Sequence, residues 1–140
     1  MKSLDLRLTA RVLAVGAALA IAVLSLSPSG DTTMEFLHLF EGLAEFFFDD
    51  GSQVDKIGHF LAYAALGGLS AFGVRMVGDA RRVLALLALA LGFYGGLLEV
   101  LQGLFPDRVS SLADWMANML GVFAGFVLAE LAHTFSRTYQ

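Results

Sequence analysis

Two groups of ionisable and amide side chains lie beside or inside long apolar stretches of this chain. The first comes just before and within one such stretch and contains Asp55, Lys56, His59 and Tyr63. The second joins two other stretches and contains Glu99, Gln102, Arg108, Asp114 and Asn118. Charged groups are costly to place in membrane-length apolar segments, so they mark a candidate functional site.

These side chains combine acids, a base and cations, which suits acid–base catalysis or the binding of an anionic group. We interpret His59, Glu99 and Asp114 as the candidate catalytic residues, with the imidazole as general base. Lys56 and Arg108 carry the positive charge that an anionic head group needs. The other predicted ligand-binding residues are Asp55, Tyr63, Gln102 and Asn118. The sequence supports a binding site as readily as an enzyme.

A metal site is not predicted from these residues. The three candidate catalytic residues are far apart in the chain, and no His-x-x-x-His or Glu-x-x-His spacing supports a ligand set. The chain has no cysteine, which excludes disulfides, thiolate catalysis and Cys-ligated metals together. We therefore expect no metal and no cofactor.

The composition is typical of an integral membrane protein. Hydrophobic residues make up 57% and charged residues 16% of the 140 residues, and the mean hydropathy is +0.71; an ordinary soluble domain is less apolar. The length allows a single domain over residues 1–140. No basic patch indicates nucleic-acid binding, so the lipid bilayer is the expected partner.

Four apolar segments supply the elements that position the polar residues. Each is close to the roughly 20 residues that cross a bilayer. None alternates like a barrel strand, and lipid leaves helices as the other spanning structure. We predict an all-α membrane protein with four transmembrane helices in a bundle, at about residues 8–27, 57–76, 82–105 and 112–135.

The polar residues fall on single faces of three of these helices. Spacings of three or four residues put each pair on one side of its helix: His59 with Tyr63, Glu99 with Gln102, and Asp114 with Asn118. All three pairs lie within a few turns of the same membrane surface. We therefore predict one polar layer, built by three helices, just beneath that surface.

The distribution of basic residues predicts which surface this is. Seven of the nine lysines and arginines lie on one side of the four segments, and only Lys56 and Arg108 lie on the other. Basic residues favour the cytoplasmic side, so both termini should be cytoplasmic. The basic, then apolar N-terminus, with small residues at Ser25 and Ser27, is also similar to a secretory signal peptide. We predict that it is retained as the first helix.

Between the first two segments, residues 32–48 are predicted to form an extracytoplasmic amphipathic helix. Thr32 and Glu35 have the spacing of a capping box. Acidic residues and His38 recur every three or four positions, and aromatic residues cover the remaining surface. We expect this helix to cover the open end of the bundle.

Small residues predict where the helices pack closely. Gly92 and Gly96 lie four residues apart on the third helix, as do Gly121 and Gly125 on the fourth. Such spacing allows backbones to approach where lipid gives helices no hydrophobic reason to associate. Because Gly92, Gly95 and Gly96 flank the face that bears Glu99, we expect the third helix to be central.

The order and spacing of these motifs resemble the VanZ-like family of small bacterial membrane proteins. The pattern runs Asp-Lys-x-x-His-x-x-x-Tyr, Glu-x-x-Gln, Pro-x-Arg, Asp, then Asn-x-x-Gly-x-x-x-Gly. It falls on Asp55, Lys56, His59, Tyr63, Glu99, Gln102, Pro106, Arg108, Asp114, Asn118, Gly121 and Gly125. Ser111 stands where the family often has an acidic residue, which we expect to weaken any network there.

The resemblance implies a protein of the bacterial cytoplasmic (inner) membrane. The family is named for a factor in low-level resistance to the glycopeptide teicoplanin, but the resemblance assigns no molecular activity. Resistance itself is not transferred, because a fold is shared more widely than a phenotype.

Three functions remain open from the sequence. The first is a site near the outer leaflet that binds or modifies a lipid-linked or amphiphilic envelope molecule. The second is a structural bundle whose polar network fixes helix packing, although interhelical polar bonds in membranes average only about 0.6 kcal/mol. The third is a small transporter or proton relay. The sequence fixes neither the substrate nor the oligomeric state.

Overall fold

Four helices make up the regular structure of the computed structural model, whose described residues are 2–27, 54–74, 80–105 and 109–138. Within those ranges there is no strand, which confirms the all-α prediction. The amphipathic helix predicted at 32–48 lies outside the described residues, as do Pro106 and Arg108. The helices are α1 Lys2–Leu26, α4 Val54–Val74, α5 Ala80–Gln102 and α6 Leu112–Thr138.

All four helices are long and apolar enough to cross a membrane. Their outward surfaces carry large apolar side chains, such as Leu89 and Phe93, which are 70% and 75% exposed. An apolar surface of this extent suits lipid and would be unusual on a water-soluble monomer. The protein is therefore a multi-pass integral membrane protein.

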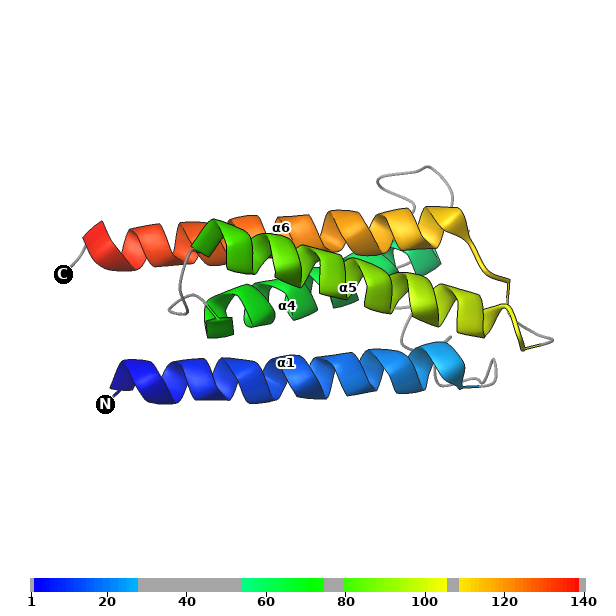
Figure 1. Ribbon diagram of the computed structural model, residues 1–140, viewed down its shortest axis with the longest axis horizontal. Coiled ribbons are helices and arrows are strands. Elements are labelled where there is room, and N and C mark those ends of the chain that lie inside the picture. The colour runs from blue at the N-terminus through cyan, green and yellow to red at the C-terminus, as the bar shows by residue number, and fades with distance from the viewer. Residues whose placement is uncertain (1, 28–53, 75–79, 106–108, 139–140) are drawn as a thin grey trace.

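The helices lie side by side in a bundle, with both chain termini at the same end (Figure 1). At the opposite end α4 and α6 begin and α5 ends. We call this opposite end the site end, because the polar residues predicted from the sequence are gathered there.

The closest pair of helices is α4 and α6. A Cβ atom at Gly121 would overlap the carbonyl oxygen of Phe60, and one at Gly125 would overlap that of Ala64. From the other side, a Cβ atom at Gly67 would lie 2.8 Å from the carbonyl oxygen of Val122. The absence of these side chains allows the two backbones to touch, as small-residue spacing on membrane helices predicts.

The central helix is α4, and the expectation that the third apolar helix, α5, would be central is wrong. The reason lies in what its glycines face. The Gly92 position meets the side chain of Met119, and the Gly96 position meets the indole of Trp115. Side chains at these contacts keep the backbones of α5 and α6 apart, so α5 packs less extensively than α4 does.

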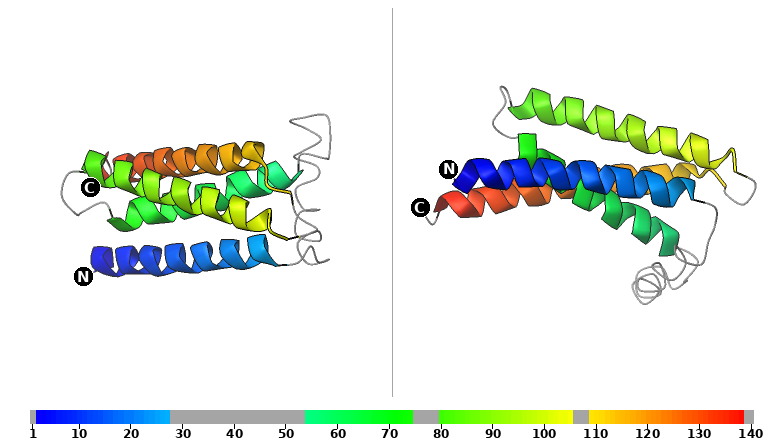
Figure 2. Two further views of the ribbon diagram at one scale, coloured as in Figure 1. Left: turned by 45° about the vertical axis from the view of Figure 1, so that its right-hand side comes forward. Right: turned by 90° about the horizontal axis from the view of Figure 1, so that it is seen from below.

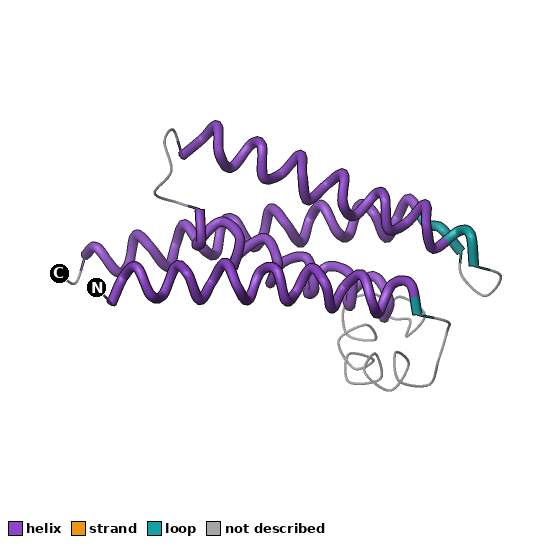
Figure 3. The backbone as a smooth tube through the Cα atoms, turned by 60° about the horizontal axis from the view of Figure 1, so that its bottom comes forward, coloured by secondary structure: helices purple, strands orange, loops and turns teal. Residues whose placement is uncertain are grey.

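Helix α5 is inclined to α1: the two helices lie close together at the site end and diverge toward the first residue of α5 (Figure 2, Figure 3). Two hydrogen bonds tie it to α1. The Gln102 amide donates to the carbonyl of Ser25 at 3.1 Å, and the Tyr94 hydroxyl donates to the carbonyl of Ala18.

Helix ends differ by several residues from those expected. Helix α1 begins at Lys2 rather than near residue 8, and α5 ends at Gln102 rather than near residue 105. After Gln102, the amides of Leu104 and Phe105 donate to carbonyls three residues earlier. This tightened turn follows directly on Gln102 and includes Gly103, a residue that commonly follows a helix end.

Candidate functional site

The first contact of the site joins α4 to α6. Nδ1 of His59 lies 3.0 Å from the amide oxygen of Asn118, whose side chain is only 2% exposed. An amide oxygen can only accept a hydrogen bond, so Nδ1 of His59 carries the hydrogen, and the lone pair of the neutral ring is on Nε2. Asn118 therefore fixes both the orientation and the tautomer of His59.

The second contact joins α5 to the start of α6 through Ser111. The Ser111 amide donates to the Oε2 atom of Glu99 at 3.1 Å. The Ser111 hydroxyl accepts from the amide of Asp114 at 3.3 Å, and the Ser111 carbonyl accepts from the amide of Trp115. Ser111 is thus the N-cap of α6, and Glu99 is attached to that cap.

Ser111 was predicted only as a departure that weakens the network, yet it takes part in the network. The signal that reveals this role is the spacing Ser111-x-x-Asp114, a form of the capping box that precedes an apolar helix.

These contacts bring the three candidate catalytic side chains together. A ring nitrogen of His59 and one carboxylate oxygen each from Glu99 and Asp114 all lie within 4.8 Å of one another. Glu99 and Asp114 are 4% and 7% exposed. Two ionised carboxylates at such a separation repel by about 3 to 4 kcal/mol at an effective dielectric constant near 20. The cluster therefore needs positive charge or a proton.

Lys56 supplies part of that charge. Its Nζ atom lies 3.7 Å from Oδ1 of Asp114 and 3.6 Å from Oδ1 of Asp55. The Asp55 carboxylate also accepts from the amide of Lys56 in the first turn of α4, where a helix favours negative charge. The Lys56 side chain is 29% exposed, so it lies at the rim of the cluster. We call His59, Glu99, Asp114, Asn118 and Lys56 the polar cluster.

Two other predicted ligand-binding residues are buried within the bundle. Gln102 is 5% exposed and donates to the backbone of α1. Tyr63 is 1% exposed, and its hydroxyl has no hydrogen-bond partner among the described residues. It lies one turn deeper than His59 and beside Gly95, where a Cβ atom would be 3.2 Å from the hydroxyl.

An apolar groove of about 960 Å³ runs between α5 and α6. Its walls come from both helices and are almost entirely apolar; among the lining residues are Ala88, Gly92, Gly96, Val100, Trp115 and Met119. Trp115 donates from its indole to the carbonyl of Gly92 at 3.0 Å. Val100 follows Glu99 in the sequence and Trp115 follows Asp114, but the two carboxylates are not among the residues that line the groove.

A family profile described as VanZ/LLP1 matches residues 11–133. The chain belongs to this VanZ-like family. No curated protein and no solved structure matches the chain. In this VanZ/LLP1 protein the matched region contains all of α4 and α5, most of α1 and α6, and every member of the polar cluster.

Proposed function

We propose that this VanZ-like protein binds an amphiphilic or lipid-linked envelope molecule at the site end. The polar cluster receives the head group, and the groove between α5 and α6 receives the apolar chain. The observation that supports this most is the groove's lining: it is almost entirely apolar, and it includes Val100 and Trp115, which directly follow Glu99 and Asp114 in the sequence. Ligand sites typically combine an apolar wall with a few convergent polar groups.

The head group is proposed to be anionic, because the cation Lys56 lies partly exposed at the rim of the polar cluster, with its side chain 29% exposed. His59 is held by Asn118 with Nε2 directed away from that hydrogen bond, so it is available as a general base if the bound molecule is also modified.

We propose that the site end faces away from the cytoplasm, in a bacterial inner membrane with both termini inside. Because the chain has no cysteine, single introduced thiols report on topology. In intact cells an impermeant maleimide should label Ser110→Cys, near the site end, and should leave Gly78→Cys, between α4 and α5, unlabelled until the cells are opened. The reverse labelling pattern would contradict this orientation.

Binding can be followed through Trp115, the only tryptophan of the chain, because it lines the groove. We expect a polyprenyl phosphate or similar phosphate amphiphile with a brominated tail to quench its fluorescence saturably in neutral detergent. Lys56→Gln should raise the half-saturation concentration about tenfold, since a hydrogen bond to a charged group contributes about 1.5 kcal/mol. Ala88→Phe should reduce quenching by filling the groove.

Controls separate specific binding from general solvation by apolar tails. The matched neutral alcohol should quench more weakly than the phosphate and should respond little to Lys56→Gln. Glu130→Gln, which removes a charge at the other end of α6, should leave the titration unchanged. If the phosphate and the alcohol quenched equally and without saturation, the proposed binding would be contradicted. The role of the polar network would then be to fix the packing of the helices.

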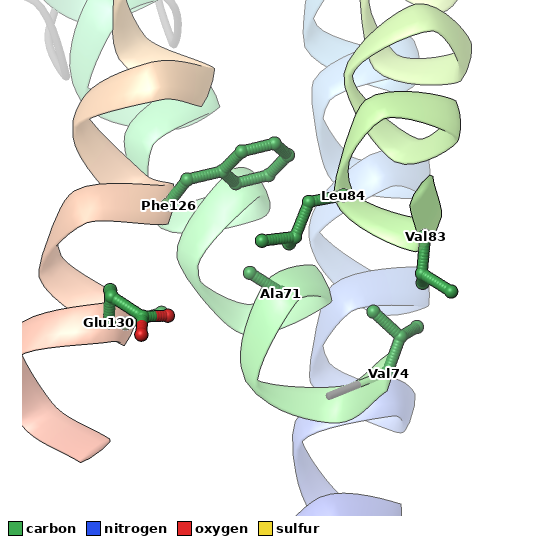
Figure 4. Close-up of a pocket in the computed structure, with 7 residues that line it drawn as sticks. Ala71, Val74, Val83, Leu84, Phe126 and Glu130 are labelled. Carbon is green, nitrogen blue, oxygen red and sulfur yellow. The ribbon is translucent and has the colours of Figure 1, made fainter. Parts of the chain in front are cut away.

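Transport is a weaker candidate because, among the described residues, the buried polar and charged side chains all lie toward the site end: Ser25, Glu99, Gln102, Asp114 and Asn118. Toward the other end, α4, α5 and α6 enclose a small cavity of about 20 Å³, lined by Ala71, Val74, Val83, Leu84, Phe126, Ala129 and Glu130 (Figure 4). This volume is that of about one water molecule. Apart from Glu130, its lining is apolar.

A further inference from the structure

We infer that His59, Glu99 and Asp114 bind a divalent metal ion at the site end. This inference deepens the proposed function, because it names an ion for the same site, but metal binding does not require that an amphiphile binds. Each ligand comes from a different helix. The fold therefore brings the three side chains together, although they are far apart in the sequence.

The geometry is that of a small chelating set. One nitrogen and two carboxylate oxygens lie within 4.8 Å of one another. Metal–ligand bonds of about 2.0 to 2.2 Å place two ligands of one ion roughly 3 to 4 Å apart. Small side-chain rotations at His59, Glu99 and Asp114 therefore suffice to bring all three atoms onto one ion.

The charges of the polar cluster favour a cation. Glu99 and Asp114 carry two potential negative charges, and Lys56 at the rim offsets one. An anionic head group arriving at this cluster would meet two carboxylates of its own sign. A divalent ion held by the two carboxylates reverses that repulsion and leaves coordination positions for a phosphate or carboxylate group.

The surroundings of His59 have the form of a metal ligand's outer shell. Ligating histidines almost always donate their other ring N–H to a fixed acceptor, which sets the tautomer. Here Nδ1 of His59 donates to Asn118 at 3.0 Å, and Asn118 is 2% exposed. The Oε2 atom of Glu99 is likewise held, by the amide of Ser111.

Two buried oxygen atoms at the cluster have no hydrogen-bond partner among the described residues. One is Oδ1 of Asp114, which has only the more distant Nζ of Lys56 at 3.7 Å. The other is the hydroxyl of Tyr63. Tyr63 lies one turn deeper than His59 on α4, and its hydroxyl is close to Gly95, which lies one turn deeper than Glu99 on α5. Buried polar atoms are normally satisfied, and an ion at the triad would satisfy Asp114 directly.

The ligand types restrict the choice of ion. Imidazole favours transition metals and zinc, and carboxylates suit Mn²⁺ as well as Mg²⁺ and Ca²⁺. One imidazole with two carboxylates therefore favours Zn²⁺ or Mn²⁺ over Mg²⁺. Three protein ligands with an open fourth position also match the arrangement of zinc sites that bind a further group.

The test is a calorimetric titration of the purified full-length protein in neutral detergent with Zn²⁺, without added amphiphile. We expect saturable binding of one ion per chain. Glu99→Gln, Asp114→Asn and His59→Ala should each weaken it by about 100-fold or more, and Asn118→Ala by about 10- to 100-fold, as outer-shell changes do. Mg²⁺ should bind more weakly than Zn²⁺.

Controls keep this test independent of folding and of the proposed function. Glu130→Gln and His133→Ala remove the same chemical groups near the other end of α6 and should leave the Zn²⁺ titration unchanged, and helical circular dichroism checks each variant. No saturable Zn²⁺ binding by the wild-type chain, or binding equal in all cluster variants, would overturn the metal site. Amphiphile quenching of Trp115 that persists under a chelator would then still support the proposed function.

Discussion

Gly125→Val is expected to lose most of its folded protein in detergent. A Cβ atom at this position would overlap the carbonyl oxygen of Ala64 and would lie 2.5 Å from the amide nitrogen of Gly68. Because these are backbone atoms, no side-chain rotation relieves the overlap, and α4 must move away from α6. Overpacking costs about 1 to 3 kcal/mol where side chains can adjust, so we expect about 3 kcal/mol or more here.

The measurement is unfolding by a denaturing detergent, followed by circular dichroism. Gly16→Val is the matched control, because a Cβ atom at Gly16 meets nothing within 4 Å; it carries the same change in helix propensity without the overlap. Gly92→Ala should be intermediate, since its nearest neighbour, the Met119 sulfur at 2.9 Å, belongs to a flexible side chain. Equal stability of Gly125→Val and Gly16→Val would refute the close contact of α4 and α6.

Lys56→Met is expected to lower the free energy of unfolding by about 1 to 2 kcal/mol. Removing one member of a fully buried ion pair costs about 3 to 5 kcal/mol, and the figure is reduced here because the Lys56 side chain is 29% exposed and partly screened by solvent. The loss arises because Asp114 and Glu99 keep their carboxylates while the nearby cation is gone.

A double-mutant cycle tests whether this loss comes from charge. Asp114→Asn should destabilise the wild type more than it destabilises Lys56→Met, with a coupling of about 1 kcal/mol. All four proteins should be measured in the presence of a chelator, so that metal binding does not contribute. Additive effects would show that Lys56 stabilises the protein through packing alone and that its 3.7 Å approach to Asp114 carries no net attraction.

Helical periodicity was sufficient to predict the polar layer. His59, Glu99 and Asp114 come from segments up to 55 positions apart in the sequence, yet each lies on a polar face near the site end of the bundle. Once the three helices are aligned by length, with α5 antiparallel to α4 and α6, those faces have one depth in common. Their mutual approach within 4.8 Å follows from that alignment.

Which helices touch was harder to predict, because a glycine pattern shows where a backbone can approach and not what approaches it. Gly121 and Gly125 on α6 meet the backbone of α4, while Gly92 and Gly96 on α5 meet side chains. The direction of the Gln102 side chain was also not predictable from the sequence. Its spacing from Glu99 put both on one face, yet its amide extends past the cluster to Ser25 on α1.

The groove between α5 and α6 is bounded by side chains that are themselves exposed on the surface of the bundle, among them Phe93 and Val100. In a bilayer that side of the molecule is bathed by acyl chains. A molecule dissolved in the leaflet would thus enter by lateral diffusion, without crossing water and without parting the helices. Its occupancy would follow its mole fraction among the lipids, so a scarce envelope intermediate would compete with every ordinary phospholipid tail for the same space.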